Sequence, residues 1–97
     1  MQAKIWNLSR WIDHIPKDEE LKEYYSETLN DSGFNVLKFT EYKFHPFGYT
    51  ALWLLGESHF AVHTFPEEDR YYIELSSCNE KYYNTFHNLI NCKLGNI

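Results

Sequence analysis

The apolar residues of this chain recur at helical spacing in two stretches. The first stretch follows Pro16, has acidic residues in its first turn that complement the helix dipole, and ends at Gly33. The second begins at Asn79, a favourable N-cap residue, and ends at Gly95. The periodic side chains are Leu21, Tyr24, Tyr25, Thr28 and Leu29 in the first stretch, and Tyr83, Phe86, Leu89, Ile90 and Leu94 in the second. Each stretch therefore predicts a helix.

Five other segments, most of them rich in β-branched and aromatic residues, have the pattern of strands. These segments are residues 4–11, 34–44, 49–55, 59–65 and 70–77. The last three are joined by short connections, which predicts an antiparallel meander, and the first is expected at a sheet edge. Residues 49–55 are apolar at nearly every position, which favours a central strand covered on both faces. The order of elements predicts an α+β fold: a two-layer sandwich in which two helices cover one face of an antiparallel β-sheet.

Length and composition are those of one small folded domain spanning residues 1–97, with 43% hydrophobic and 19% aromatic residues. The net charge is -5 and the basic residues are scattered, so duplex nucleic acid and anionic membranes are not expected as partners. The chain has neither a membrane-spanning run nor a signal peptide, which predicts a cytoplasmic location. A domain so small, with so many aromatic residues, predicts a homo-oligomer whose sites lie near the subunit interface.

Reactive side chains are densest between Glu57 and Glu67, where two carboxylates, two imidazoles and a hydroxyl occur together. Strand periodicity places His59 and His63 on one face and Ser58 on the other. A histidine on a strand is more often structural than catalytic. The two histidines have no obvious third ligand, so no metal site is expected.

The next strand carries Glu74, Ser76 and Cys78 on one face, which predicts a polar row beside His63. An imidazole and a thiol in that row would exchange protons. The competing interpretation is that Cys78 is a small buried hydrophobic residue.

The chain also contains an ordered series of motifs: Phe44-x-Pro46-x-Gly48-x-Thr50, then Glu57-Ser58-His59, then His63-Thr64-Phe65-Pro66-Glu67, and finally Cys78. This series resembles the short prokaryotic S-adenosylmethionine decarboxylase proenzyme family over about two-thirds of the chain. The chain departs from the usual pattern in having Phe65 in place of Trp and Thr50 in place of the more common Ser.

The resemblance implies self-cleavage of the bond between Glu57 and Ser58, which converts the serine into a covalent pyruvoyl group that binds the substrate amine. Thr50 and His63 would assist this processing, and Cys78 would give a proton to the decarboxylated product.

The resemblance also implies a nucleoside site. Phe44 and Phe65 would flank the adenine, and Glu67 would hold the ribose hydroxyls of S-adenosylmethionine.

Two enzymatic hypotheses and one without catalysis follow. Because Ser58 is an ordinary serine in an uninterrupted chain, the main hypothesis is a lyase without a cofactor. It would act on S-adenosylmethionine or its adenylated conjugate, SAM-AMP, by elimination or internal displacement, and would release methylthioadenosine or its adenylate with homoserine lactone or a related fragment. Glu57, His63 and Glu67 would steady the sulfonium or the methionine tail, and CRISPR-linked antiviral signalling would be the setting.

The alternative hypothesis is a pyruvoyl-dependent S-adenosylmethionine decarboxylase of polyamine synthesis. The third is a nucleoside-binding module without catalysis.

Overall fold

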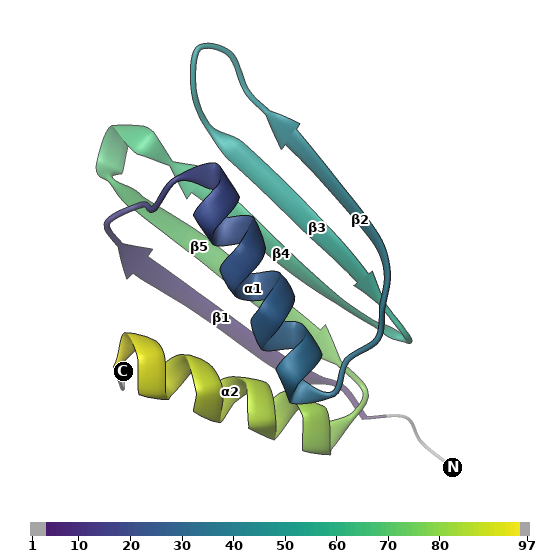
Figure 1. Cartoon of the computed structure of the whole chain (residues 1–97). Coiled ribbons are helices and arrows are strands. Elements are labelled where there is room, and N and C mark those ends of the chain that lie inside the picture. The colour runs from purple at the N-terminus through teal and green to yellow at the C-terminus, as the bar shows by residue number, and fades with distance from the viewer. Residues whose placement is uncertain (1–3, 96–97) are drawn as a thin grey trace.

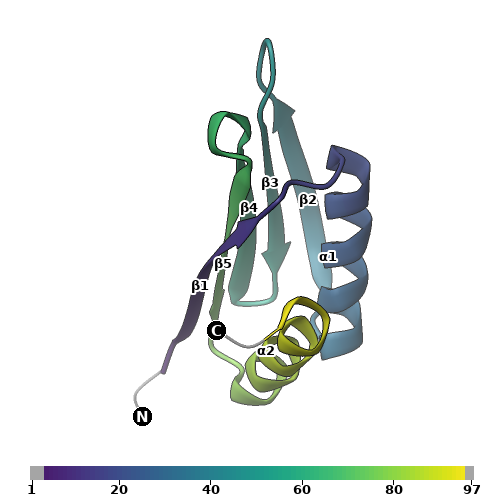
Figure 2. The same cartoon turned by 90° about the vertical axis from the view of Figure 1, so that its left-hand side faces the viewer.

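A single antiparallel sheet of five strands, in the order β1-β5-β4-β3-β2, is the frame of the molecule (Figure 1). The computed structural model describes residues 4–95. The strands are β1 (Trp6–Asp13), β2 (Val36–Lys43), β3 (Tyr49–Leu55), β4 (Ser58–Phe65) and β5 (Arg70–Ser77). The helices are α1 (Asp18–Ser32) and α2 (Glu80–Leu94), and a short 3-10 turn, η1 (Pro66–Glu68), joins β4 to β5. Both helices lie on the same side of the sheet, which confirms the predicted α+β two-layer sandwich (Figure 2).

Each helix ends where the sequence predicts. Gly33 follows α1 with a φ of 107°, a left-handed conformation that favours glycine. A Cβ at this position would lie 2.7 Å from the ring of Tyr82, so the site also requires the absence of a side chain. At the start of α2, the side chain of Asn79 accepts a hydrogen bond from the backbone N–H of Tyr82 at 2.9 Å. These caps fix where the chain enters and leaves the helical layer.

The core lies between the helices and the inward face of the sheet. Large aromatic rings from both layers fill it, and Trp53, Tyr25, Phe60 and Phe86 are fully buried. Two of their polar atoms are paired: the Trp53 indole donates to Ser26 Oγ at 3.0 Å, and the hydroxyls of Tyr25 and Tyr71 are 2.9 Å apart. Buried polar atoms with partners cost little, so these contacts add specificity to an otherwise apolar layer.

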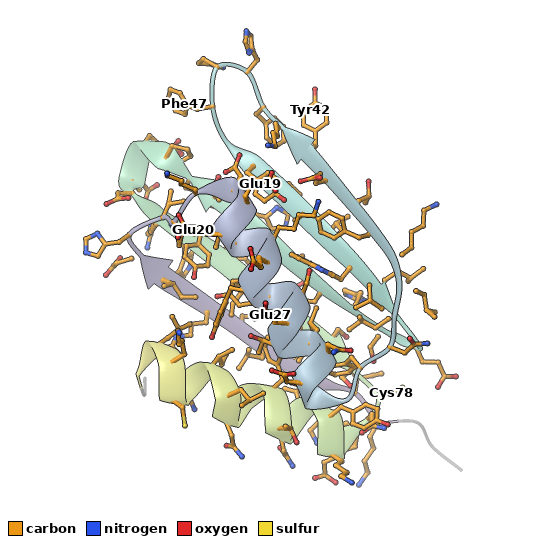
Figure 3. All side chains as sticks on the ribbon, viewed as in Figure 1. Glu19, Glu20, Glu27, Tyr42, Phe47 and Cys78 are labelled. Atoms are coloured by element: carbon orange, nitrogen blue, oxygen red, sulfur yellow. The ribbon has the colours of Figure 1, made fainter. Side chains whose placement is uncertain are left out.

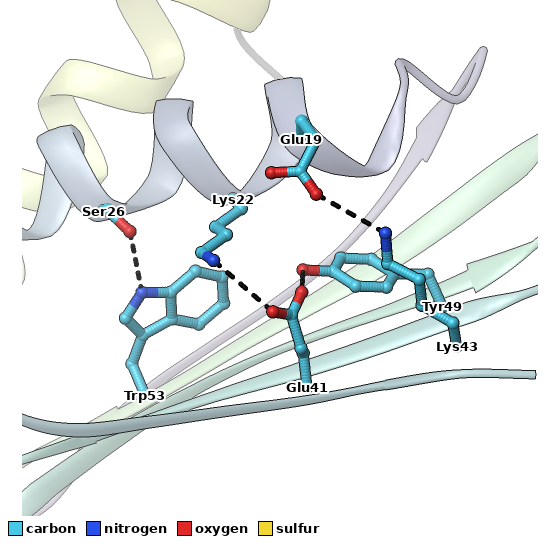
Figure 4. A network of polar contacts seen from close by, with 7 residues as sticks. All are labelled: Glu19, Lys22, Ser26, Glu41, Lys43, Tyr49 and Trp53. Carbon is cyan, nitrogen blue, oxygen red and sulfur yellow. Dashed lines mark hydrogen bonds and ion pairs between the residues drawn. The ribbon is translucent and has the colours of Figure 1, made fainter.

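Polar contacts also attach α1 to strands β2 and β3 (Figure 4). The Tyr49 hydroxyl donates to a Glu41 carboxylate oxygen at 2.6 Å, and Lys22 of α1 approaches the other oxygen at 3.4 Å. The hydrogen bond from Tyr49, together with Lys22, lowers the pKa of Glu41. A second pair joins Lys43 to Glu19 at 3.4 Å. The network holds the helix over the β2–β3 hairpin, which extends beyond the other strands (Figure 1).

The opposite face of the sheet, called the open face below, is not covered by either helix (Figure 2). Leu52 and Leu54 of β3 are 44% and 52% exposed there. The prediction that residues 49–55 are covered on both faces is therefore wrong for one chain. The apolar pattern predicts a strand, but it does not show whether helices of the same chain cover both of its faces.

The first strand differs slightly from its predicted bounds, which were residues 4–11. It runs from Trp6 to Asp13 because it pairs along its whole length with β5, from Trp6 opposite Ser77 to Asp13 opposite Arg70. Its predicted place at a sheet edge is confirmed.

Candidate functional site

The tight turn between β3 and β4 carries the bond between Glu57 and Ser58. Leu55 pairs directly with Ser58, so Gly56 and Glu57 alone make the turn. Glu57 has a φ of 55°, the left-handed region in which a residue with a side chain is strained. The bond is therefore held at a strained point that the flanking ladder enforces.

Cys78 lies beside this bond. Since Ser58 pairs with Ser77, the next residue of the chain is placed next to Glu57. The Cys78 thiol donates to the backbone carbonyl oxygen of Glu57 at 3.3 Å and lies 3.6 Å from an oxygen of the Glu57 carboxylate. A donor at this carbonyl polarises it and would stabilise negative charge on its oxygen.

The hydroxyl of Ser58 points into the sandwich and is nearly buried, with 6% of the residue exposed. It donates to Ser77 Oγ at 3.3 Å, while Ser77 Oγ accepts from the Asn79 backbone N–H at 3.0 Å. A hollow of about 270 Å³ borders the same turn and is lined in part by Glu57 and Cys78. The serine hydroxyl is therefore held by Ser77 on the core side, and the hollow lies beside the preceding residue, Glu57.

Sequence reasoning did not identify Ser77 as part of this group. Its alternation with Ile73 and Leu75 placed it on the core side, where the structure also puts it. The missing information was the pairing of β4 with β5, which brings Ser77 opposite Ser58.

A second group lies on the open face. Thr50 and His63 are directly paired across β3 and β4, and the Thr50 hydroxyl is 3.0 Å from Nδ1 of the imidazole. Tyr42 and Tyr72 occupy the neighbouring strands in the same row. The threonine fixes the orientation of the imidazole ring.

Aromatic side chains surround the end of the sheet near this pair. Phe44, which follows β2, is 50% exposed and contacts Tyr42 with 4.8 Å between ring centroids. Gly48, beside Phe44, has a φ of 119°, which favours glycine. Phe65 ends β4, and Glu67 is exposed in η1, the turn that follows. The sheet thus presents aromatic rings, an imidazole and a carboxylate at one end.

The two groups lie apart within one chain. Ser58 and His63 are five residues apart on β4, about 16 Å at the rise of a strand, and they face opposite sides. Cys78 lies at the opposite end of the sheet from Tyr42 and Phe47 (Figure 3).

The predicted exchange of protons between imidazole and thiol is therefore wrong within a single chain. His63 is opposite Tyr72, while the polar row formed by Glu74 and Ser76 lies opposite Ala61 and His59. Cys78 follows the end of β5, past the last paired residues, Ser58 and Ser77.

Comparison with known proteins places the chain in a family. Residues 5–95 match the family model described as S-adenosylmethionine decarboxylase. The chain is 40% identical over 62 residues to S-adenosylmethionine decarboxylase proenzyme 2 of Bacillus cereus, an alignment of 63% of this chain and 50% of the relative. It is 33% identical over 70 residues to the S-adenosylmethionine decarboxylase proenzyme of Persephonella marina, which aligns 72% of this chain and 50% of the relative. In these alignments the chain spans about half the length of the curated relatives it matches.

A solved structure shares the fold. The adenosylmethionine decarboxylase from Aquifex aeolicus superposes with a TM-score of 0.75 at 19% identity, covering 93% of this chain and 78% of that chain. Within residues 4–95, no helix is long and apolar enough to span a membrane.

The expectation of an enzyme without a cofactor is wrong. The relatives are proenzymes by name, and members of the matched family depend on a covalent pyruvoyl group made from their own chain. An ordinary serine at position 58 does not argue against such a group, because an encoded proenzyme carries a serine before it cleaves itself.

Proposed function

Because the chain belongs to the S-adenosylmethionine decarboxylase family, we propose that it is a proenzyme that cleaves itself between Glu57 and Ser58 and then decarboxylates S-adenosylmethionine for polyamine synthesis. The observation that carries the proposal is the contact of the Cys78 thiol with the Glu57 carbonyl, directly before the Ser58 hydroxyl. Nucleophile, electrophile and hydrogen-bond donor therefore lie together at the turn between β3 and β4, the donor being supplied by the residue that follows β5.

Self-cleavage begins when Ser58 Oγ attacks the carbonyl carbon of Glu57. The Cys78 thiol supports the oxygen as it gains negative charge, and Ser77 Oγ holds the attacking hydroxyl in place. The amide C–N bond breaks, an ester C–O bond forms, and the hydroxyl proton is taken up by the serine nitrogen. Elimination then breaks the C–O bond between the ester and the serine Cβ and releases the Glu57 carboxylate. Hydrolysis of the residue left at position 58 consumes water and releases ammonia.

The residues present fit the pyruvoyl group that results. Glu57, which directly precedes the precursor serine, lines a hollow together with Cys78, so a substrate in that hollow would lie beside the processed bond and the thiol. When formed, the group supplies a carbonyl that draws electrons from the bond that releases carbon dioxide. The thiol of Cys78 is then the proton donor to the product.

The substrate is held through its nucleoside. We assign the adenine to the space beside Phe44 and Phe65, and the ribose hydroxyls to the Glu67 carboxylate. His63, fixed by Thr50, serves the processing reaction.

The distance between the two groups is explained if two copies of the chain share each site. Exposed apolar residues on the open face, including Leu52 and Leu54, are suited to packing against a second copy. In such a homodimer, Ser58 and Cys78 of one chain would meet Thr50 and His63 of the other. The cytoplasmic location stays a prediction.

The carbon–sulfur lyase takes second place. The matched relatives bear decarboxylase names, and nothing in those names concerns SAM-AMP, CRISPR or antiviral defence. A nucleoside-binding module without catalysis is the remaining alternative.

Denaturing mass spectrometry of the purified protein tests the proposal. We expect two fragments divided between Glu57 and Ser58, and one intact chain of 11.7 kDa for Ser58→Ala. Carbon dioxide release from S-adenosylmethionine should accompany cleavage. An intact wild-type chain that releases methylthioadenosine would establish the lyase instead, and an intact chain that only binds would establish the binding module.

A further inference from the structure

Phe65 is held from one side by a tryptophan that comes from the far edge of the sheet. It lies on the open face, where neither helix reaches it. Trp11 of β1 contacts Phe65 with 5.2 Å between ring centroids and an interplanar angle of 55°. The orientation of Phe65 therefore depends on a residue two strands away.

Trp11 is itself fixed although it is 46% exposed. The guanidinium carbon of Arg70 lies 4.0 Å from the centroid of a Trp11 ring, and the ring of Tyr72 packs 5.1 Å away. An exposed indole in contact with a cation and two aromatic rings loses most of its rotational freedom. Such an arrangement on an otherwise uncovered surface is not required by the core.

Arg70 is fixed in turn by Glu68. Its Nη2 lies 2.7 Å and its Nε 2.8 Å from the same carboxylate oxygen of Glu68. Glu68 belongs to η1, the three-residue turn that also carries Glu67. The contacts thus connect β1 and β5 to the turn that presents the proposed ribose ligand.

We infer that Trp11, Arg70 and Glu68 form a positioning array that orients Phe65 and Glu67 for the nucleoside. The inference rests on the proposed function, because it assumes that Phe65 flanks the adenine and Glu67 binds the ribose. The array acts through these two residues and need not touch the reacting atoms. Its loss should weaken nucleoside binding more than it weakens the fold, since its members lie outside the buried core.

Titration of the purified protein with 5′-methylthioadenosine, followed by calorimetry, tests the array. We expect Trp11→Ala to raise the Kd about tenfold and Trp11→Phe to recover most of the affinity, because the smaller ring still packs on Phe65. Arg70→Gln should raise the Kd about threefold. Arg70→Gln should also reduce the dependence of the Kd on sodium chloride. Salt screens the ion pair between Arg70 and Glu68 in the wild type, and the variant has no such pair to screen. A merely structural residue would not change the salt dependence.

Trp6→Ala is the matched control. Trp6 lies on the same strand as Trp11 but at its other end, where it pairs with Ser77. Melting temperature and sedimentation of every variant should match those of wild type, which separates a loss of affinity from a loss of folding or assembly. Equal affinity of wild type and Trp11→Ala would overturn the array and leave the proposed nucleoside site intact. So would an equal loss in Trp6→Ala. A folded wild type that binds neither 5′-methylthioadenosine nor S-adenosylmethionine would overturn both proposals.

Discussion

Glycine in place of Glu57 should make the protein more stable and its self-cleavage slower. At a φ of 55°, a residue with a Cβ is strained by about 1–2 kcal/mol, and glycine is not. Glycine has greater freedom in the unfolded chain, which offsets about 0.5–1 kcal/mol of that gain. The free energy of unfolding of the Glu57→Gly variant should therefore be about 0.5–1 kcal/mol higher than that of the Glu57→Ala variant. Alanine is the matched control because both variants lose the carboxylate near Cys78.

The same strain should appear in the rate of cleavage. If it raises the energy of the ground state before Ser58 attacks, relieving about 0.5–1 kcal/mol slows the reaction about two- to fivefold. Urea unfolding in a Ser58→Ala background measures stability without cleavage, and timed denaturing mass spectrometry measures the rate in the active chain. Equal stability of the glycine and alanine variants would refute the strain, while equal rates with unequal stability would show that the strain does not serve the reaction.

Three further predictions concern assembly, the end of α1 and pH. Mixing Ser58→Ala chains with His63→Ala chains should restore cleavage in the mixture, because a homodimer with shared sites then contains one complete site; inactivity of refolded mixtures would argue against sharing. Gly33→Ala should destabilise the protein by about 2–3 kcal/mol in urea unfolding, since its φ of 107° is strained for alanine and its Cβ would overlap an aromatic ring. The hydrogen bond between His14 and Asp69 raises the pKa of His14 and lowers the pKa of Asp69. Its stabilisation should be complete only between about pH 4 and pH 6.5, fading as either partner loses its charge. Melting temperatures of wild type and an Asp69→Asn variant should differ most in that window, and a constant difference across pH would contradict the pairing.

Local patterns were sufficient for much of the fold. The caps at Asn79 and Gly33 act through neighbouring atoms of the same segment, so their residue types alone predict where helices begin and end. Alternation along β5 likewise predicted which side chains enter the core, because a strand turns successive residues to opposite faces. These signals need no knowledge of distant parts of the chain.

The sequence by itself determined the elements and the face of each side chain, and its motifs point to the bond between Glu57 and Ser58 as the proposed cleavage site. Only the tertiary structure decided which groups meet. The register of β4 on β5 puts Cys78 at the Glu57 carbonyl and Ser77 at Ser58, and it places His63 at the other end of the strand. Register depends on contacts between strands that are separate in sequence, and a shift of two residues changes every partner while it keeps every side chain on its face. The periodicity within any one strand is the same in every such register and so does not reveal the choice.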